Sequence, residues 1–103
     1  MKEKDCPLTP TLNLLSKKWM LPILHQLSLS TYKRFGELED NLKGISSRIL
    51  VQRLKELQEF GIVKRISYHE TPPRVEYSLT KKGEELYACF KSLGEWTMKW
   101  NTK

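Results

Sequence analysis

The sequence has 103 residues, 39% of them hydrophobic and 29% charged, which is typical of a single globular domain spanning residues 1–103 and excludes a disordered chain. No apolar stretch approaches the roughly 20 residues of a membrane-spanning helix, and the charged start MKEKDCPLTP lacks the apolar segment of a secretion signal, so we expect a cytoplasmic protein without a membrane partner. The net charge of +6 favours an anionic partner such as nucleic acid.

The first third of the chain predicts two helices. Thr9 as the N-cap and Pro10 at the first helical position would begin a short helix through TLNLLS. Ser16 can cap a second helix at about residues 18–28, where apolar side chains recur at helical spacing. The serine-rich segment Ser28–Lys33 is then expected to be a loop.

The middle of the chain predicts a helix-turn-helix at about residues 34–60. A helix over about residues 34–42 is followed by a Gly-containing turn and by a helix over Ser46–Phe60, with Ser46 as its N-cap. Gly61 supplies the C-terminal stop. Leu50, Leu54 and Leu57 follow the i, i+4, i+7 spacing of one buried face.

The last third predicts two strands and a long helix. Ile62–Tyr68 and Arg74–Leu79 would form a hairpin at about residues 62–79, whose HETPP connection is too long for a tight turn. A final helix is expected at about residues 80–100. The order helix-helix-helix-helix-strand-strand-helix indicates an α+β, mainly α fold, a winged helix-turn-helix with an additional helix at each end.

The helix at residues 46–60 carries its cations on the face opposite the leucines, whereas its acids, Glu56 and Glu59, lie at the far end. This arrangement suits a DNA major groove, where Arg48 can pair with a guanine edge and Gln52 with an adenine edge. A solvated helix face is the plain alternative, and Arg53 could instead pair with an acid such as Glu56 or Glu59. The DNA-binding candidates are Ser46, Ser47, Arg48, Val51, Gln52, Arg53 and Lys55, with Lys33 and Arg34 before the first helix of the motif and Arg74 at the base of the wing.

Five segments of the chain resemble one prokaryotic family. They read CPLTPTLNLLSKKW, KRFGEL, GISSRILVQRLKEL, EFGIVKR and ETPPRVEYSLTKKG, and together they cover about residues 6–83. Their order and spacing are similar to those of HxlR-type winged helix-turn-helix transcriptional regulators, which are related to MarR proteins. The resemblance implies a homodimer, paired through the first and last helices, that binds half-sites in double-stranded promoter DNA. It also implies that an N-terminal cysteine can respond to oxidants or electrophiles.

Cys6 matches that N-terminal cysteine, which makes redox sensing a hypothesis; a silent surface thiol is the alternative. Lys2 and Lys4 nearby favour a thiolate, and Asp5 opposes it. Cys89 is expected to be a small buried apolar residue rather than a redox partner of Cys6.

The last helix carries more aromatic residues than one small core needs. A core role is the plain interpretation, but aromatics on more than one side of a terminal helix favour a second covering surface, as in a dimer. The dimerisation candidates are Leu12, Leu86, Phe90, Leu93, Trp96 and Trp100.

Nothing in the sequence indicates an enzyme. His25 and His69 are isolated, no group of ligands has metal spacing, and no serine, histidine and carboxylate are placed as a catalytic set, so we expect neither a metal nor another cofactor. Two functions remain open: a homodimeric sequence-specific DNA-binding regulator, and a winged-helix module that docks proteins.

Overall fold

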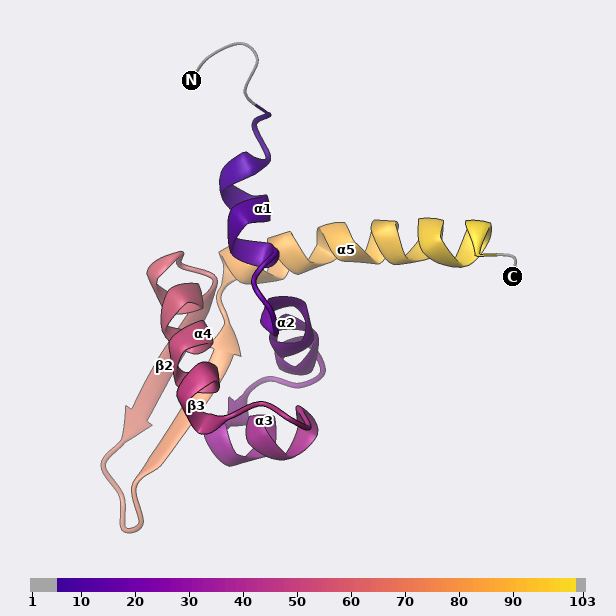
Figure 1. Cartoon of the computed structure of the whole chain (residues 1–103). Helices are drawn as coiled ribbons and strands as arrows, with labels where there is room; N and C mark the ends of the chain where they lie inside the picture. Colours follow the sequence, from indigo (N-terminus) through magenta and orange to yellow (C-terminus); the bar gives the residue numbers. More distant parts are fainter. Residues whose placement is uncertain (1–5, 102–103) are drawn as a thin grey trace.

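The computed structural model describes residues 6–101, a mainly helical winged helix-turn-helix (Figure 1). Its elements in chain order are α1 (Thr9–Leu15), α2 (Met20–Ser28), β1 (Lys33–Arg34), α3 (Phe35–Asn41), α4 (Ser47–Glu59), β2 (Val63–Tyr68), β3 (Arg74–Leu79) and α5 (Lys81–Trp100). Helices α2, α3 and α4 pack together beside the hairpin of β2 and β3, whereas α1 and the end of α5 extend away from this body (Figure 1).

The core is built from the apolar faces of α2, α3, α4 and the hairpin. On α4 the three leucines predicted to face inward, Leu50, Leu54 and Leu57, are all fully buried, as the periodicity predicted. Burying a side chain of this size contributes about 1.5–3 kcal/mol. The remaining core residues are Leu14, Met20, Ile23, Leu24, Leu27, Leu38, Leu42, Ile62, Val63 and Tyr77.

Both ends of α4 are formed by the predicted local signals. The Ser46 hydroxyl accepts a hydrogen bond from the Ile49 amide at 3.1 Å, which satisfies one of the free donors of the first turn. At the other end Gly61 has a φ of 78°, a left-handed conformation that glycine adopts without steric cost. The chain then reverses, and the Ile62 amide donates to the Leu57 carbonyl at 2.9 Å, the longer bond of a Schellman motif.

The sheet has three antiparallel strands in the order β1-β3-β2, and β1 was not predicted. Strand β1 has only two residues, paired as Lys33 with Tyr77 and Arg34 with Glu76, so no local alternation could reveal it. Because β3 is the central strand, even its polar residues Glu76 and Ser78 are buried.

The predicted caps of the first two helices are wrong. Leu8, not Thr9, is the N-cap of α1, and it makes no side-chain capping bond. The hydroxyl of Ser16 instead donates back to the Asn13 carbonyl at 3.1 Å and helps to end α1. Helix α2 begins after Trp19, whose φ of 81° is unusual for a bulky residue.

Within residues 6–101, helix α5 is anchored by its first half alone. The Thr80 hydroxyl accepts from the Gly83 amide at 3.0 Å and caps the helix. Gly83 lies against the backbone of Ile62, and a Cβ there would stand 2.2 Å from the Ile62 carbonyl oxygen. Every residue from 91 to 100 is exposed in the protomer.

Candidate nucleic-acid interface

The outer face of α4 is free in the protomer. Since the leucines of α4 point into the core, Arg48, Val51, Gln52 and Lys55 all stand exposed on the opposite side, with Val51 50% exposed. Ser46 and Ser47 are exposed at the start of the helix. This face therefore offers a guanidinium, an amide, an ammonium and an apolar side chain from consecutive turns of one helix.

The N-terminal end of this face is cationic, although an acidic residue of α3 lies beside it. The positive end of the α4 dipole and Arg48 lie together at its first turns. Glu39 on α3 accepts a hydrogen bond from the Ser47 hydroxyl, which fixes that side chain. Ser47 can thus still accept a bond at its oxygen, but its proton is engaged inside the protomer.

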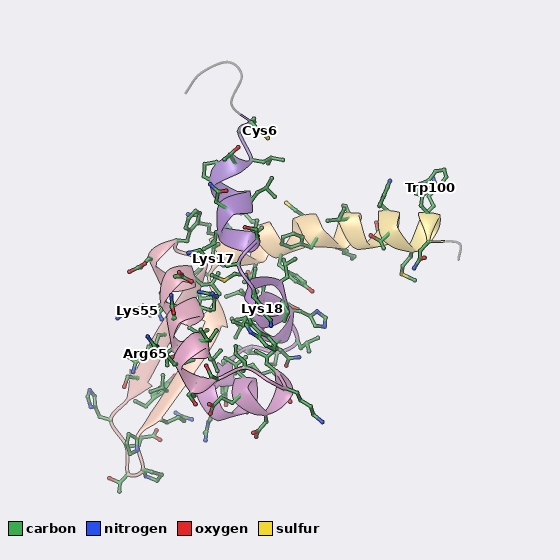
Figure 2. All side chains as sticks on the ribbon, in the orientation of Figure 1. Cys6, Lys17, Lys18, Lys55, Arg65 and Trp100 are labelled. Atoms are coloured by element: carbon green, nitrogen blue, oxygen red, sulfur yellow. The ribbon has the colours of Figure 1, made fainter. Side chains whose placement is uncertain are left out.

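Arg65 on β2 was missed by the sequence reasoning. It is exposed, and Figure 2 shows Arg65 and Lys55 projecting on the same side of the molecule, beside β2 and α4. The sequence signal was the basic pair in VKR, which we assigned only to a strand. Together the two cations extend the positive surface of α4 toward the hairpin.

Arg53 does not belong to this free surface. Its side chain is only 15% exposed, and its Nη1 lies 2.9 Å from a carboxylate oxygen of Glu56. Its Nε donates to the Lys18 carbonyl at 2.9 Å. The pairing with Glu56 that the sequence left open is therefore the one adopted, and we drop Arg53 from the expected DNA contacts.

Arg74 is held within the wing, which argues against its expected role as a DNA contact. Its two terminal nitrogens lie 3.2 Å from Glu70 and 3.3 Å from Glu76. Its guanidinium also stacks 4.1 Å from the centre of the Tyr68 ring. These contacts occupy the guanidinium at the loop end of the hairpin, where Arg74 pairs with Tyr68 across the ladder.

The two cations before α3 differ in exposure. Lys33 is half-buried on β1, whereas Arg34 is exposed. Arg34 is also the N-cap residue of α3, where its amide donates to the Glu37 carboxylate at 2.8 Å. The side chain of Arg34 is thus the freer of the two.

Both cysteines are free thiols and both are exposed. For Cys89 this corrects the expectation of a buried apolar residue, because its position on α5 faces away from the core; its Sγ lies 3.6 Å from the Glu85 carbonyl oxygen. The neighbours Lys2, Lys4 and Asp5 lie outside the described residues.

The expected dimerisation residues fall into two groups. Leu12, Leu93, Trp96 and Trp100 are each more than half exposed. Leu86 and Phe90 are instead partly buried against the core of the same protomer. The exposed group lies on α1 and on the second half of α5, the two helices that extend from the body of the protein (Figure 1).

Other kinds of site are not found in the part of the chain that the structure describes. Within residues 6–101 no three His, Cys, Asp or Glu side chains are grouped so that they could hold a metal ion. Among the same residues no helix has both the length and the apolar composition needed to cross a membrane.

The fold and the exposed face of α4 define the chain as a winged helix-turn-helix protein of the kind that binds DNA. Residues 14–103 match the HxlR-like helix-turn-helix family, and the chain belongs to that family. The family comprises transcriptional regulators rather than enzymes.

Individual relatives agree with this assignment. The uncharacterised regulator YvaP of Bacillus subtilis is 43% identical over 96 residues, covering 92% of this chain and 88% of YvaP. A transcriptional regulator of the MarR family from Enterococcus faecalis has a similar structure, with a TM-score of 0.85, 37% identity and coverage of 97% of this chain and 93% of that one. The transcriptional regulator YodB of Bacillus subtilis in its reduced form gives a TM-score of 0.83 and 38% identity, covering 93% and 94%; YodB is also known in a diamide-treated form.

Proposed function

We propose that this chain is a sequence-specific regulator that binds double-stranded promoter DNA as a homodimer, in the cytoplasm and as one winged-helix domain. The observation that carries the proposal is the exposed face of α4, where Arg48 and Gln52 stand free while the leucines on the other side anchor the helix. A helix presented in this way fits the major groove, which is wide enough to admit it.

Different residues take different parts in binding. Arg48 and Gln52 are the base-reading side chains, because a guanidinium and an amide can each make two bonds to a purine edge. Lys55, Arg34 and Arg65 are exposed cations that contact phosphates and set the register of the protein on the duplex. Val51, half exposed between the two base-reading positions, suits apolar contact with a thymine methyl group.

Pairing of two protomers would cover the apolar side chains that one protomer leaves exposed. Leu12 on α1 and Leu93, Trp96 and Trp100 on α5 expose large apolar surfaces that are costly in water. A symmetric dimer through these helices places two recognition helices about one helical turn of DNA apart, roughly 34–36 Å.

The redox response rests on Cys6. Its thiol is exposed near the start of α1, the helix that we place in the dimer interface. The relative YodB is known both reduced and after diamide, a thiol oxidant. Oxidation of Cys6 would therefore alter the chain directly before α1, a helix that contributes to pairing. The altered pairing would change the affinity of the dimer for DNA.

A salt titration separates this function from protein docking. Duplexes are selected from a random library with the protein, and the affinity of the best duplex is measured at about 50 and about 200 mM salt. A dimer with about six to ten phosphate contacts should lose about 10³–10⁵ in affinity between these conditions. Weak binding without a steep salt dependence would contradict DNA recognition and favour a protein-docking module.

A further inference from the structure

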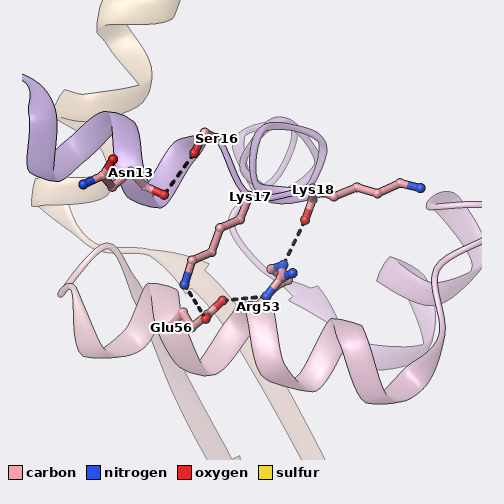
Figure 3. Close-up of polar contacts among 6 residues, drawn as sticks. All are labelled: Asn13, Ser16, Lys17, Lys18, Arg53 and Glu56. Carbon is pink, nitrogen blue, oxygen red and sulfur yellow. Dashed lines mark hydrogen bonds and ion pairs between the residues drawn. The ribbon is translucent and has the colours of Figure 1, made fainter.

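The junction between α1 and α2, residues 16–19, contacts the recognition helix through side chains that the DNA interface does not use. Figure 3 shows Lys17 and the Lys18 carbonyl directed at Arg53 and Glu56, whereas the Lys18 side chain points away. Lys17 Nζ lies 2.7 Å from one carboxylate oxygen of Glu56, and Arg53 Nη1 lies 2.9 Å from the other. One carboxylate therefore joins the junction to α4.

Arg53 makes a second, direct bond to the same junction. Its Nε donates to the Lys18 carbonyl at 2.9 Å while its Nη1 holds Glu56. Both Arg53 and Glu56 are mostly buried, with 15% and 20% of their side chains exposed. A planar guanidinium that bonds in two directions has little rotational freedom, so it fixes the position of the junction relative to α4.

The junction also reaches the turn that precedes α4. Trp19, with its left-handed backbone, is half-buried against the core. Its ring carbon Cη2 would stand 3.8 Å from a Cβ at Gly44, within ordinary van der Waals distance. Lys17 and Lys18 thus contact the recognition helix near its middle, and Trp19 lies beside the chain just before the start of that helix.

We infer that Arg53 and Glu56 are positioning residues, which hold the recognition helix at a fixed angle to α1 and thereby set the separation of half-sites that the dimer accepts. The inference rests on the proposed function, because α1 determines that separation only if it belongs to the dimer interface. Lys17, Arg53 and Glu56 form the link, and Arg48 and Gln52 at the front of the same helix read the DNA.

Substitution of Glu56 distinguishes positioning from simple electrostatics. Glu56→Gln removes a negative charge from a DNA-binding helix, which by charge alone should tighten binding to every duplex. If Glu56 positions α4, the same variant should lose its preference for one half-site spacing. Glu59→Gln is the matched control, since Glu59 is exposed on the same helix and makes none of these contacts.

The probes are a selected operator with two half-sites, the same operator with one base pair inserted or deleted between them, and a duplex with a single half-site. We expect the wild type and Glu59→Gln to prefer the original spacing, and the preference to fall about threefold to tenfold in Glu56→Gln. Binding of the single half-site should not weaken. A Glu56→Gln variant with the spacing preference of the wild type would overturn the inference.

A second pair of variants guards against a general loss of stability. Lys17→Gln should reduce the spacing preference, and Lys18→Gln should not, because only the carbonyl of Lys18 takes part in the link. Both residues are exposed, so neither variant removes core packing. If the wild type bound no duplex specifically, the proposed function itself would fail; if it bound with a spacing preference that neither Glu56→Gln nor Lys17→Gln altered, only this inference would fail.

Discussion

Arg48, Arg53 and Arg74 carry the same group into three environments. Arg48 is exposed on the first turn of α4, and that turn contains no acidic residue. The N–H donors of its guanidinium therefore stay available. Arg53 and Arg74 each lie within bonding distance of a carboxylate on their own helix or strand. The nearest acid in space, rather than the type of residue, thus decides which arginine keeps its donors free for a partner such as DNA.

Glu56 should make the stability of the protein depend on pH. Its pKa lies below the ordinary value of 4.5, mainly because of the hydrogen bond from Lys17 and then that from Arg53, which together outweigh desolvation. Since the folded pKa is lowered, the stabilisation is complete above the unfolded pKa and is lost as the pH falls through the folded one. We expect Glu56→Gln to cost about 0.5–1 kcal/mol at pH 7. In denaturant titrations this difference should shrink below about pH 4.5; a difference that stays constant would contradict the role of the charged carboxylate.

Substitution of the N-terminal thiol tests the redox response. Cys6→Ser keeps the size of the side chain and removes the oxidisable sulfur, so we expect unchanged DNA affinity but no loss of binding after diamide. Cys89→Ser is the informative comparison, because Cys89 is also exposed. Band shifts before and after diamide report the outcome. If the wild-type complex ignores diamide, Cys6 is not a sensor.

At the scale of elements, α5 makes one especially close approach to the rest of the chain. Gly83 allows the first turn of α5 to lie directly on the backbone that enters β2, and the Thr80 hydroxyl bonds to the Gly61 carbonyl beside it. This contact joins the long C-terminal helix to the end of the helix-turn-helix.

Gly83→Ala should therefore destabilise the protein. The added methyl group would meet the Ile62 carbonyl oxygen at 2.2 Å, a backbone atom that cannot move aside cheaply. Overpacking of this kind costs about 1–3 kcal/mol. Gly36→Ala is the control, because nothing lies within 4 Å of its Cβ and alanine favours the helix. Thermal unfolding followed by circular dichroism should show a lower Tm only for Gly83→Ala.

Local signals predicted some elements well and others not at all. The limits of β3 and the Ser46 cap of α4 followed from alternation and from one capping residue. Strand β1 could not be predicted, because its two residues are a strand only through pairing with β3. The left-handed backbone of Trp19 was missed for a similar reason: helical spacing placed Trp19 inside a helix, and only the fold shows that this helix begins after it.

The candidate site divides in the same way. The exposure of Arg48, Gln52 and Lys55 follows from helical spacing, because it is the reverse of the buried leucine face. The engagement of Arg53 with the Lys18 carbonyl links positions 35 residues apart, which no periodicity encodes. The exposure of Cys89 likewise depends on which face α5 turns toward the core, which the sequence around it does not fix.

At the scale of the whole molecule, the second half of α5 exposes large apolar side chains, and nothing within residues 6–101 of a single copy of the chain accounts for them. Leu93, Trp96 and Trp100 stand on a helix that extends away from the core (Figure 1). Tryptophan buries about 150–250 Å² when covered and is frequent among residues that dominate association.

Trp96→Ser should weaken pairing without unfolding the protomer. A residue of this kind typically contributes about 2 kcal/mol or more to association, which corresponds to about a 30-fold weaker dimer. Sedimentation over a range of concentrations measures the change, and Lys91→Ser, an exposed polar position on the same half of α5, serves as the control. Equal self-association of wild type and Trp96→Ser would place the interface elsewhere.

The central claim is that the outer face of α4 reads DNA sequence. The most direct measurement is a selection from random duplexes, carried out in parallel with the wild type and with Arg48→Ala. We predict two symmetric half-sites for the wild type, about 10–10.5 base pairs apart, and loss of preference at one position in each half-site for the variant, worth about 1–3 kcal/mol of discrimination. A variant that selects the same sequence as the wild type, with the same preference at every position, would contradict the claim.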